Sequence, residues 1–297
     1  MSLASPIFSI VIPTYNRAHL IARTIESVLK QQSCDDFEVL IIDDGSKDNT
    51  GEVVRNFKDY RMRYYFKENA ERGAARNFGA IRAVGQYINF FDSDDVMYPN
   101  HLAIANNLIQ RLNKPEFFHL AYDYKLEDGT LVGKMDSFDE STRDAVFFDN
   151  TLSCNGIFIR RDIARQFPFE EDRVLSSSED WELWIRLISR FKLHLSNEIT
   201  STVISHDQRS LLTIDAKKVV DRDLLFIDTL RRDAVVMLNY GYSFRRFIAE
   251  RYTFFMLCFA EQRQRREVWK WGWKAFWVYP LILLSKRFLA SIKNTLK

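Results

Sequence analysis

The sequence predicts an α/β protein in which a mostly parallel sheet is flanked by helices and followed by a helical C-terminal extension. Short apolar runs alternate with helical segments over residues 1–115. Strand-like pieces separated by turn residues occupy 117–160, and helical periodicity runs from residue 215 to the end. Strands that alternate with helices of about 10–15 residues are typical of βαβ units, which make neighbouring strands parallel.

The first strand illustrates the pattern. The run IFSIVI at residues 7–12 is almost continuously apolar, as expected for a strand buried on both faces. The other strands expected in this part are 37–42, 62–66 and 86–91. The expected helices are 18–31, 48–57, 72–84 and 101–112.

The second part of the chain shows a different pattern. Strand-like pieces over 117–160 are joined by turn signals such as Asp128-Gly129, which favours an antiparallel or mixed extension of the sheet. A helix is expected over 178–191 and a strand over 198–204. We therefore expect one domain over 1–210, with halves at 1–115 and 116–210, and a helical extension over 211–297.

Composition limits the classes of function and the compartment. The chain has 297 residues and a net charge of +2, too small to indicate a nucleic acid as the main partner. Cys34, Cys154 and Cys258 lie far apart without metal-binding spacing, which indicates a reducing, cytoplasmic environment. No basic residues precede the first apolar run, and no apolar run reaches about 18 residues. We therefore expect neither a signal peptide nor a transmembrane helix.

Polar turns follow the first, second and fourth strands. They begin at Pro13, Asp43 and Asp92, and in open α/β sheets ligands bind in the crevice at this edge. The two acidic turns carry five carboxylates: Asp43, Asp44, Asp92, Asp94 and Asp95. Clustered like charges repel one another, so such a group usually holds a cation or accepts hydrogen bonds from a ligand.

The expected ligand is a phosphate compound bound through a metal. The chain has neither GxGxxG after its first strand nor GxxxxGK[ST] anywhere, so it lacks a glycine cradle for phosphate. Asp92 and Asp94, one residue apart in a turn, can face one hard cation such as Mn²⁺ or Mg²⁺. Water and phosphate oxygens would complete the coordination.

Five sequence blocks, taken together, carry a family resemblance. In order they are PTYNR, DDGSKDNT, ENAERGAARNFGA, YINFFDSDD and SSSEDWELWIRL. Their order and spacing over roughly 1–190 resemble the family 2 glycosyltransferases, which have the Rossmann-like GT-A fold. The resemblance implies inverting transfer of a sugar from a nucleotide-diphosphate sugar, with a UDP-sugar favoured, assisted by Mn²⁺ or Mg²⁺. The acceptor would be a hydroxyl of a glycan or lipid-linked glycan. Residues 1–210 would be the catalytic domain, with a nucleotide-binding and an acceptor half.

The resemblance also implies residue roles. Asp180 would be the general base, with Glu179 beside it, and Asp44 would accept a hydrogen bond from the nucleotide base. The implied nucleotide-sugar-binding residues are Pro13, Thr14, Tyr15, Asn16, Asp43, Asp44, Arg76, Asp92, Ser93 and Asp94. The implied metal ligands are Asp94, Asp95 and His206. Many relatives carry glycine soon after the asparagine of the third block. Here Ala70 follows Asn69, so the loop before Arg76 is expected to differ.

Other interpretations stay open. Residues 176–179 match a helix capping box, and 43–46 match an ordinary turn. The segment 90–96 also reads as an apolar strand followed by DxDxV, which resembles haloacid-dehalogenase-type phosphatases, although that motif normally follows the first strand. A non-catalytic nucleotide-binding protein is the third alternative.

The C-terminal tail, residues 263–297, differs from the rest of the chain. From residue 261 onward there are nine Lys or Arg, two acids and four of the six tryptophans. An apolar stripe with helical spacing runs over 268–292 at Trp269, Trp273, Phe276/Trp277, Pro280/Leu281, Leu284, Phe288 and Ile292, and Pro280 is expected to kink or divide it. Such a segment suits a membrane interface, which would make the protein peripheral on the inner face of the membrane. Packing on its own domain, or on a second copy in a homodimer, is the alternative.

Overall fold

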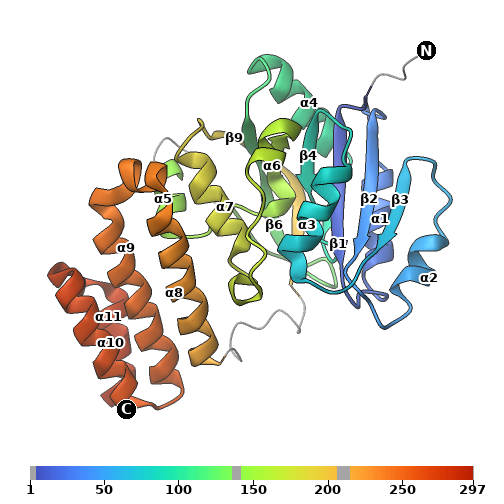
Figure 1. Cartoon of the computed structure of the whole chain (residues 1–297). Coiled ribbons are helices and arrows are strands. Elements are labelled where there is room, and N and C mark those ends of the chain that lie inside the picture. Colours follow the sequence, from blue (N-terminus) through green and yellow to red (C-terminus); the bar gives the residue numbers. More distant parts are fainter. Residues whose placement is uncertain (1–4, 136–141, 206–214, 297) are drawn as a thin grey trace. The chain divides into compact units, whose positions relative to one another are not determined.

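The computed structural model describes residues 5–135, 142–205 and 215–296, and the chain forms two compact units, Met1–Ser210 and Leu211–Lys297 (Figure 1). Each unit has its own buried apolar cluster. Within the described ranges, no helix combines the length and the apolar character needed to cross a membrane.

One mixed sheet forms the centre of the first unit. Among the described residues its strand order is β3-β2-β1-β4-β8-β6-β9-β5, with β7 paired to β6. The pairs among β3, β2, β1 and β4 are parallel, whereas β8 is antiparallel to both β4 and β6. The strands are β1 (Phe8–Thr14), β2 (Phe37–Asp43), β3 (Met62–Phe66), β4 (Tyr87–Phe90), β5 (Val96–Met97), β6 (Phe117–Leu126), β7 (Leu131–Lys134), β8 (Ile157–Arg160) and β9 (His194–Ser205).

Helices cover both faces of this sheet (Figure 1). Ile10 and Ile12 of β1 join Ile25 of α1 and Leu102 of α4 in one buried cluster, whereas Val11 faces Gly79 of α3 on the opposite side. Burial on both faces explains why β1 reads as a continuous apolar run. The helices of this unit are α1 (Ile21–Leu29), α2 (Thr50–Arg55), α3 (Glu71–Arg82), α4 (His101–Arg111), α5 (Thr142–Phe148), α6 (Arg161–Gln166) and α7 (Glu179–Ile188), with the short 3₁₀ turns η1 (Cys154–Gly156) and η2 (Arg173–Leu175).

The fold confirms the predicted α/β class, with the parallel half over the first strands and the mixed extension beyond β4. β3 has the predicted bounds, β6 spans the strand-like run FFHLAYDYKL, and the other predicted strands and helices occur with shifted ends. β5, α5 and α6 were not predicted from the sequence. Each spans seven residues or fewer, so none shows a clear hydrophobic period.

The second unit is helical. Its elements are α8 (Ala216–Arg232), α9 (Ala234–Glu261), α10 (Arg265–Val278), the 3₁₀ turn η5 (Pro280–Leu284) and α11 (Lys286–Leu296). Asp233 caps α9 by accepting hydrogen bonds from the backbone N–H groups of Val235 and Val236. Phe255 and Met256 of α9 are fully buried in the same cluster as Trp271 of α10.

The predicted stripe over 268–292 is divided at Pro280, as its sequence predicts. α10 ends at Val278, and α11 begins at Lys286. Proline has no backbone N–H, so it cannot continue the helical hydrogen bonds. The apolar positions of the stripe are therefore distributed over two helices and the turn between them.

Candidate active site

The turns after β1 and β2 are held together by hydrogen bonds at the carboxyl edge of the sheet. Asn16, at φ 51°, donates its backbone N–H to Ser46 Oγ at 2.9 Å and accepts the N–H of Lys47 on its Oδ1 at 2.8 Å. Gly45 has φ +83°, a region that disfavours side chains, and an added Cβ would lie 2.9 Å from the backbone nitrogen of Asn69. The DDGS turn therefore requires glycine and forms one surface with the PTYNR turn.

The two acids of the DDGS turn are buried and bonded. Asp43 accepts the Tyr64 hydroxyl at 2.7 Å and the backbone N–H of Ser46 at 2.8 Å. Asp44 is ion-paired with Lys67 and accepts Asn69 Nδ2 at 3.1 Å. Burial of the Tyr64 ring and its bond to Asp43 raise the pKa of that phenol. The structure thus places both predicted acids at the site edge, where they also fix the loop after β3.

Arg76 connects the DSDD turn to the start of α7. Its side chain is 1% exposed, donates from Nη1 to Glu179 Oε1 at 2.7 Å and from Nη2 to Asp92 Oδ1 at 3.0 Å. Its guanidinium also lies over the Phe169 ring, 5.2 Å from the centroid. Although sequence reasoning assigned Arg76 to the nucleotide, its observed contacts join two acidic motifs that lie far apart in the sequence.

The remaining acids of the DSDD turn differ in their partners. Asp94 lies 3.7 Å from Arg17 Nε. Asp95 is 1% exposed, and its two carboxylate oxygens accept Asn155 Nδ2 at 2.7 Å and the backbone N–H of Ile204 at 2.9 Å. Asn155 also accepts the backbone N–H of Asp92 at 2.9 Å. Asp95 and Asn155 therefore fix the shape of the turn that presents Asp92 and Asp94.

Asp180 lies in the first turn of α7 and is half-buried. Its Oδ1 accepts the backbone N–H of Trp181 at 2.7 Å, and its Oδ2 lies 4.0 Å from the Cys154 thiol. Burial, and then the neighbouring Glu179 carboxylate, raise the pKa of Asp180 to about 6. A carboxylate with such a pKa is mostly ionised at neutral pH and more basic than an exposed aspartate.

The other predicted residues lie as follows. Pro13 and Thr14 are buried at the end of β1, whereas Tyr15 exposes 41% of its surface. Ser93 is buried within the DSDD turn. His206 lies outside the described residues.

Sequence reasoning missed Asn155, Lys67 and the contact of Cys154 with Asp180. Asn155 lies 60 residues from Asp95 in the sequence. Its one local signal is that it is the polar first residue of the strand-like run NGIFIR, and this does not identify its partner.

A divalent cation fits the chemistry of this edge. Asp92 and Asp94 offer hard oxygen ligands, and 30% of the Asp92 side chain is exposed. The described residues contain no group of three His, Cys, Asp or Glu arranged to hold a metal. A cation here would therefore draw most of its ligands from water and from a bound phosphate compound, as Mg²⁺ and Mn²⁺ commonly do.

A mixed α/β sheet with flanking helices and acidic turns at the carboxyl edge of its parallel strands has the architecture of the GT-A class. Solved structures share this fold. Staphylococcus aureus TarS 1–349 in complex with UDP-GlcNAc matches with a TM-score of 0.63 at 15% identity, over 92% of this chain and 91% of that one. The mannosyltransferase PcManGT from Pyrobaculum calidifontis, in complex with GDP-Man and Mn²⁺, matches with a TM-score of 0.59 at 14% identity, over 98% and 87%.

The chain belongs to glycosyl transferase family 2, whose model matches residues 9–162. This confirms the family predicted from the five blocks, and it disagrees with the phosphatase alternative.

Two relatives illustrate the range of similarity. An uncharacterized glycosyltransferase of Rickettsia bellii is 31% identical over 209 residues, which is 69% of this chain but only 30% of that relative. The Escherichia coli protein WfgD, named UDP-Glc:alpha-D-GlcNAc-diphosphoundecaprenol beta-1,3-glucosyltransferase, is 31% identical over 181 residues, covering 61% of this chain and 69% of WfgD.

Proposed function

We propose that this protein is an inverting glycosyltransferase that transfers a sugar from a nucleotide-diphosphate sugar to an acceptor hydroxyl. The observation that carries the proposal is the link from Asp92 through Arg76 to Glu179, because it fixes the DSDD turn beside the helix that holds Asp180. A donor-binding turn and a carboxylate of raised pKa are thereby held at one edge of the sheet.

Asp180 is the proposed general base. At neutral pH its carboxylate accepts the proton of the acceptor hydroxyl as that oxygen attacks the anomeric carbon, and the bond to the diphosphate breaks on the opposite side. Attack from the opposite side inverts the configuration at that carbon. A base positioned in this way contributes about 10²–10⁴ in rate. Glu179 is the proposed positioning residue, since it is buried and paired with Arg76.

Mn²⁺ or Mg²⁺ is the proposed cofactor, held through Asp92 and Asp94. Such a cation supplies positive charge to the diphosphate leaving group. Asp95 was also expected to bind metal, but its oxygens accept bonds from Asn155 and Ile204, so we propose that it shapes the turn instead.

The proposed donor is a UDP-sugar, and the proposed acceptor is a glycan or lipid-linked glycan. TarS was solved with UDP-GlcNAc, and the name of WfgD gives it a UDP-sugar donor and a diphosphoundecaprenol-linked acceptor. PcManGT was solved with GDP-Man, so the base of the nucleotide must be tested directly. A lipid-linked acceptor fits the proposed location, which is cytoplasmic and peripheral on the inner face of the membrane.

Turnover of UDP-, GDP- and TDP-sugars with Mn²⁺, measured as released nucleoside diphosphate, tests this function. A glycan and a lipid-linked glycan serve as alternative acceptors, and NMR of the product reports the anomeric configuration. The correct donor at 100 times its dissociation constant should also add about 2.7 kcal/mol to the free energy of unfolding. A product of retained configuration, or hydrolysis of phosphate monoesters without sugar transfer, would contradict the proposal.

A further inference from the structure

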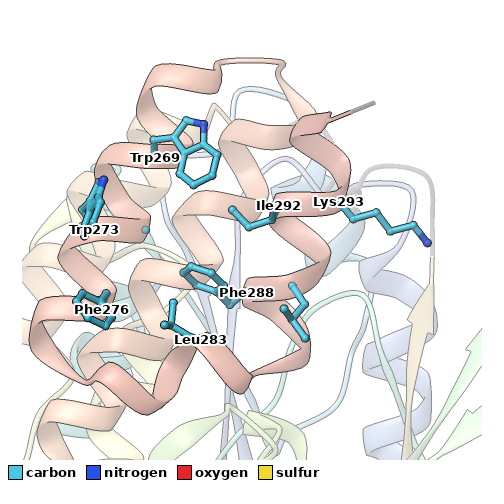
Figure 2. Close-up of a pocket in the computed structure, with 9 residues that line it drawn as sticks. Trp269, Trp273, Phe276, Leu283, Phe288, Ile292 and Lys293 are labelled. Carbon is cyan, nitrogen blue, oxygen red and sulfur yellow. The ribbon is translucent and has the colours of Figure 1, made fainter.

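An apolar cavity of about 870 Å³ lies in the second unit, between α10 and α11 (Figure 2). Trp269, Trp273 and Phe276 line it from α10, Phe288 and Ile292 line it from α11, and Leu283 lines it from η5. Figure 2 shows the rings of Trp269 and Phe288 and the side chain of Ile292 close together. Its volume falls within the range of about 300–1,000 Å³ that is usual for ligand pockets.

The cavity lies at the surface of its unit, and its lining residues Phe288 and Ile292 pack on their other side against the buried core. Trp271, the neighbour of the lining residues along α10, is 4% exposed and packs against Phe255. In contrast, Trp273 is 61% exposed and Leu289, which also lines the cavity, is 58% exposed. Large apolar side chains gathered at a surface mark a binding site more often than a packing defect.

The helices that line the cavity belong to a tail of positive net charge. Among the described residues that line it, Lys293 alone carries a charge, and Figure 2 shows its side chain extending away from the rings. From residue 261 onward the chain has nine Lys or Arg against two acids, although Lys274 lies over the ring of the buried Trp271, 4.2 Å from its centroid, and not on the lining. The cavity is therefore apolar, with one lysine on its lining.

We propose that this cavity takes one acyl chain of an anionic phospholipid from a bilayer surface. A hydrocarbon chain needs no hydrogen bonds and matches the apolar lining, and an anionic headgroup matches Lys293 and the positive net charge of the tail. Exposed tryptophans beside lysines are the side chains that favour the membrane interface. The apolar lining would instead offer a folded protein partner few groups that could form hydrogen bonds with its backbone.

The proposal goes beyond the transfer reaction, because every lining residue belongs to the second unit. The predicted membrane contact then has a defined binding site, which is the cavity, and a defined ligand, which is one acyl chain of a lipid with an anionic headgroup. The division at Pro280 also contributes, because the break lets α11 lie beside α10 and line the cavity from a second side.

Flotation and tryptophan quenching with the full chain test the proposal. The vesicles are phosphatidylcholine, with or without 30% phosphatidylglycerol that carries bromine on its acyl chains. Wild-type protein should float with the anionic vesicles, and its tryptophan fluorescence should fall because bromine quenches indoles that it contacts. Leu289→Asp and Lys293→Glu should each lower vesicle binding roughly tenfold at low salt.

Matched controls identify the cavity as the cause. Leu238→Asp changes an 84% exposed leucine of α9 outside the lining, and Lys218→Glu changes an exposed lysine of α8, so both should bind vesicles like wild type. Circular dichroism shows whether each variant folds. UDP-sugar binding in the same variants keeps failure of this proposal distinct from failure of the proposed reaction.

Three outcomes would overturn the proposal. They are absence of acyl-chain quenching, equal binding to pure phosphatidylcholine, and an equal loss of binding in Leu238→Asp. Self-association that Leu289→Asp abolishes, without vesicle binding by the wild type, would assign the surface to a second copy of the chain instead.

Discussion

The candidate active site of the first unit and the tail surface of the second unit are built from different side chains. In the first unit, Asp95, Arg76 and Glu179 are each at most 2% exposed and bonded to one another or to nearby groups. In the second unit, Trp277 is 73% exposed and Leu284 is 79% exposed. Buried, bonded charges fix directions, as chemistry on a defined bond requires, whereas exposed apolar groups give non-directional attraction to a surface.

Asp180→Asn should lower turnover by about 10²–10⁴ because the amide cannot accept the acceptor proton. The asparagine side chain has almost the same shape as the aspartate that it replaces, so the affinity for the donor should stay close to that of the wild type. Steady-state kinetics and donor titration of the same protein check both statements. Asp144→Asn, in the first turn of α5, is the control and should keep full turnover. A variant at position 180 that keeps more than half its turnover would exclude Asp180 as the base.

Glu179→Gln should lower the free energy of unfolding by about 3 kcal/mol, because it leaves the buried Arg76 guanidinium with one carboxylate fewer. Glu26→Gln removes an exposed partner of Lys30 and should change the free energy of unfolding by less than about 0.5 kcal/mol. Chemical denaturation followed by circular dichroism compares the two. Equal effects would show that the buried link contributes no more than a surface ion pair.

Removal of divalent metal with EDTA should weaken binding of UDP by at least about tenfold, and Asp94→Asn should do the same in the presence of Mn²⁺. The reason is that no glycine cradle replaces the cation between carboxylates and diphosphate. Calorimetric titration measures both affinities, with Asp128→Asn in an exposed turn as the control. Unchanged affinity in EDTA would refute the metal role.

The pH profile should show an acidic limb. Because burial and the Glu179 carboxylate raise the pKa of Asp180 to about 6, the base is protonated below that pH, and kcat/KM should fall about tenfold per unit there. Glu179→Gln removes one negative charge, so it should move the limb to lower pH. Rates measured from pH 4.5 to 8 check this. If Glu179→Gln leaves the acidic limb at the same pH, a group other than Asp180 causes the limb.

Leu289→Asp should change the free energy of unfolding by less than about 0.5 kcal/mol, because the side chain is already exposed. Thermal denaturation in the absence of lipid measures this small effect. A large loss of stability would mean that Leu289 supports the fold of the second unit, and it would contradict the assignment of Leu289 to a binding surface.

The sequence predicted what depends on local pattern. β1 and β2 have continuous apolar runs because both of their faces are buried, and the acidic turns follow because a parallel sheet brings strand ends to one edge. Pro280 predicted the break in the tail because its effect on the backbone is local.

What the sequence did not reveal depends on distant partners. Burial of Arg76 between Asp92 and Glu179 joins residues up to 103 positions apart, and its spacing in α3 does not distinguish it from a ligand-binding arginine. Similarly, the apolar stripe of the tail predicted an amphipathic face, but only the folded unit shows that its members on two helices line one open cavity.

The contacts of Asn155 have a practical consequence for altering specificity. Its side chain, in η1, bonds both Asp95 and the backbone of Asp92, so residues 153–156 fix the shape of the DSDD turn. Gly156 beside it approaches the β6 backbone so closely that an added Cβ would lie 2.2 Å from Leu120 O. In a chimaera of two relatives, an exchanged loop that follows the DSDD turn should therefore end before Ser153. Residues 153–156 should come from the same parent as the DSDD turn.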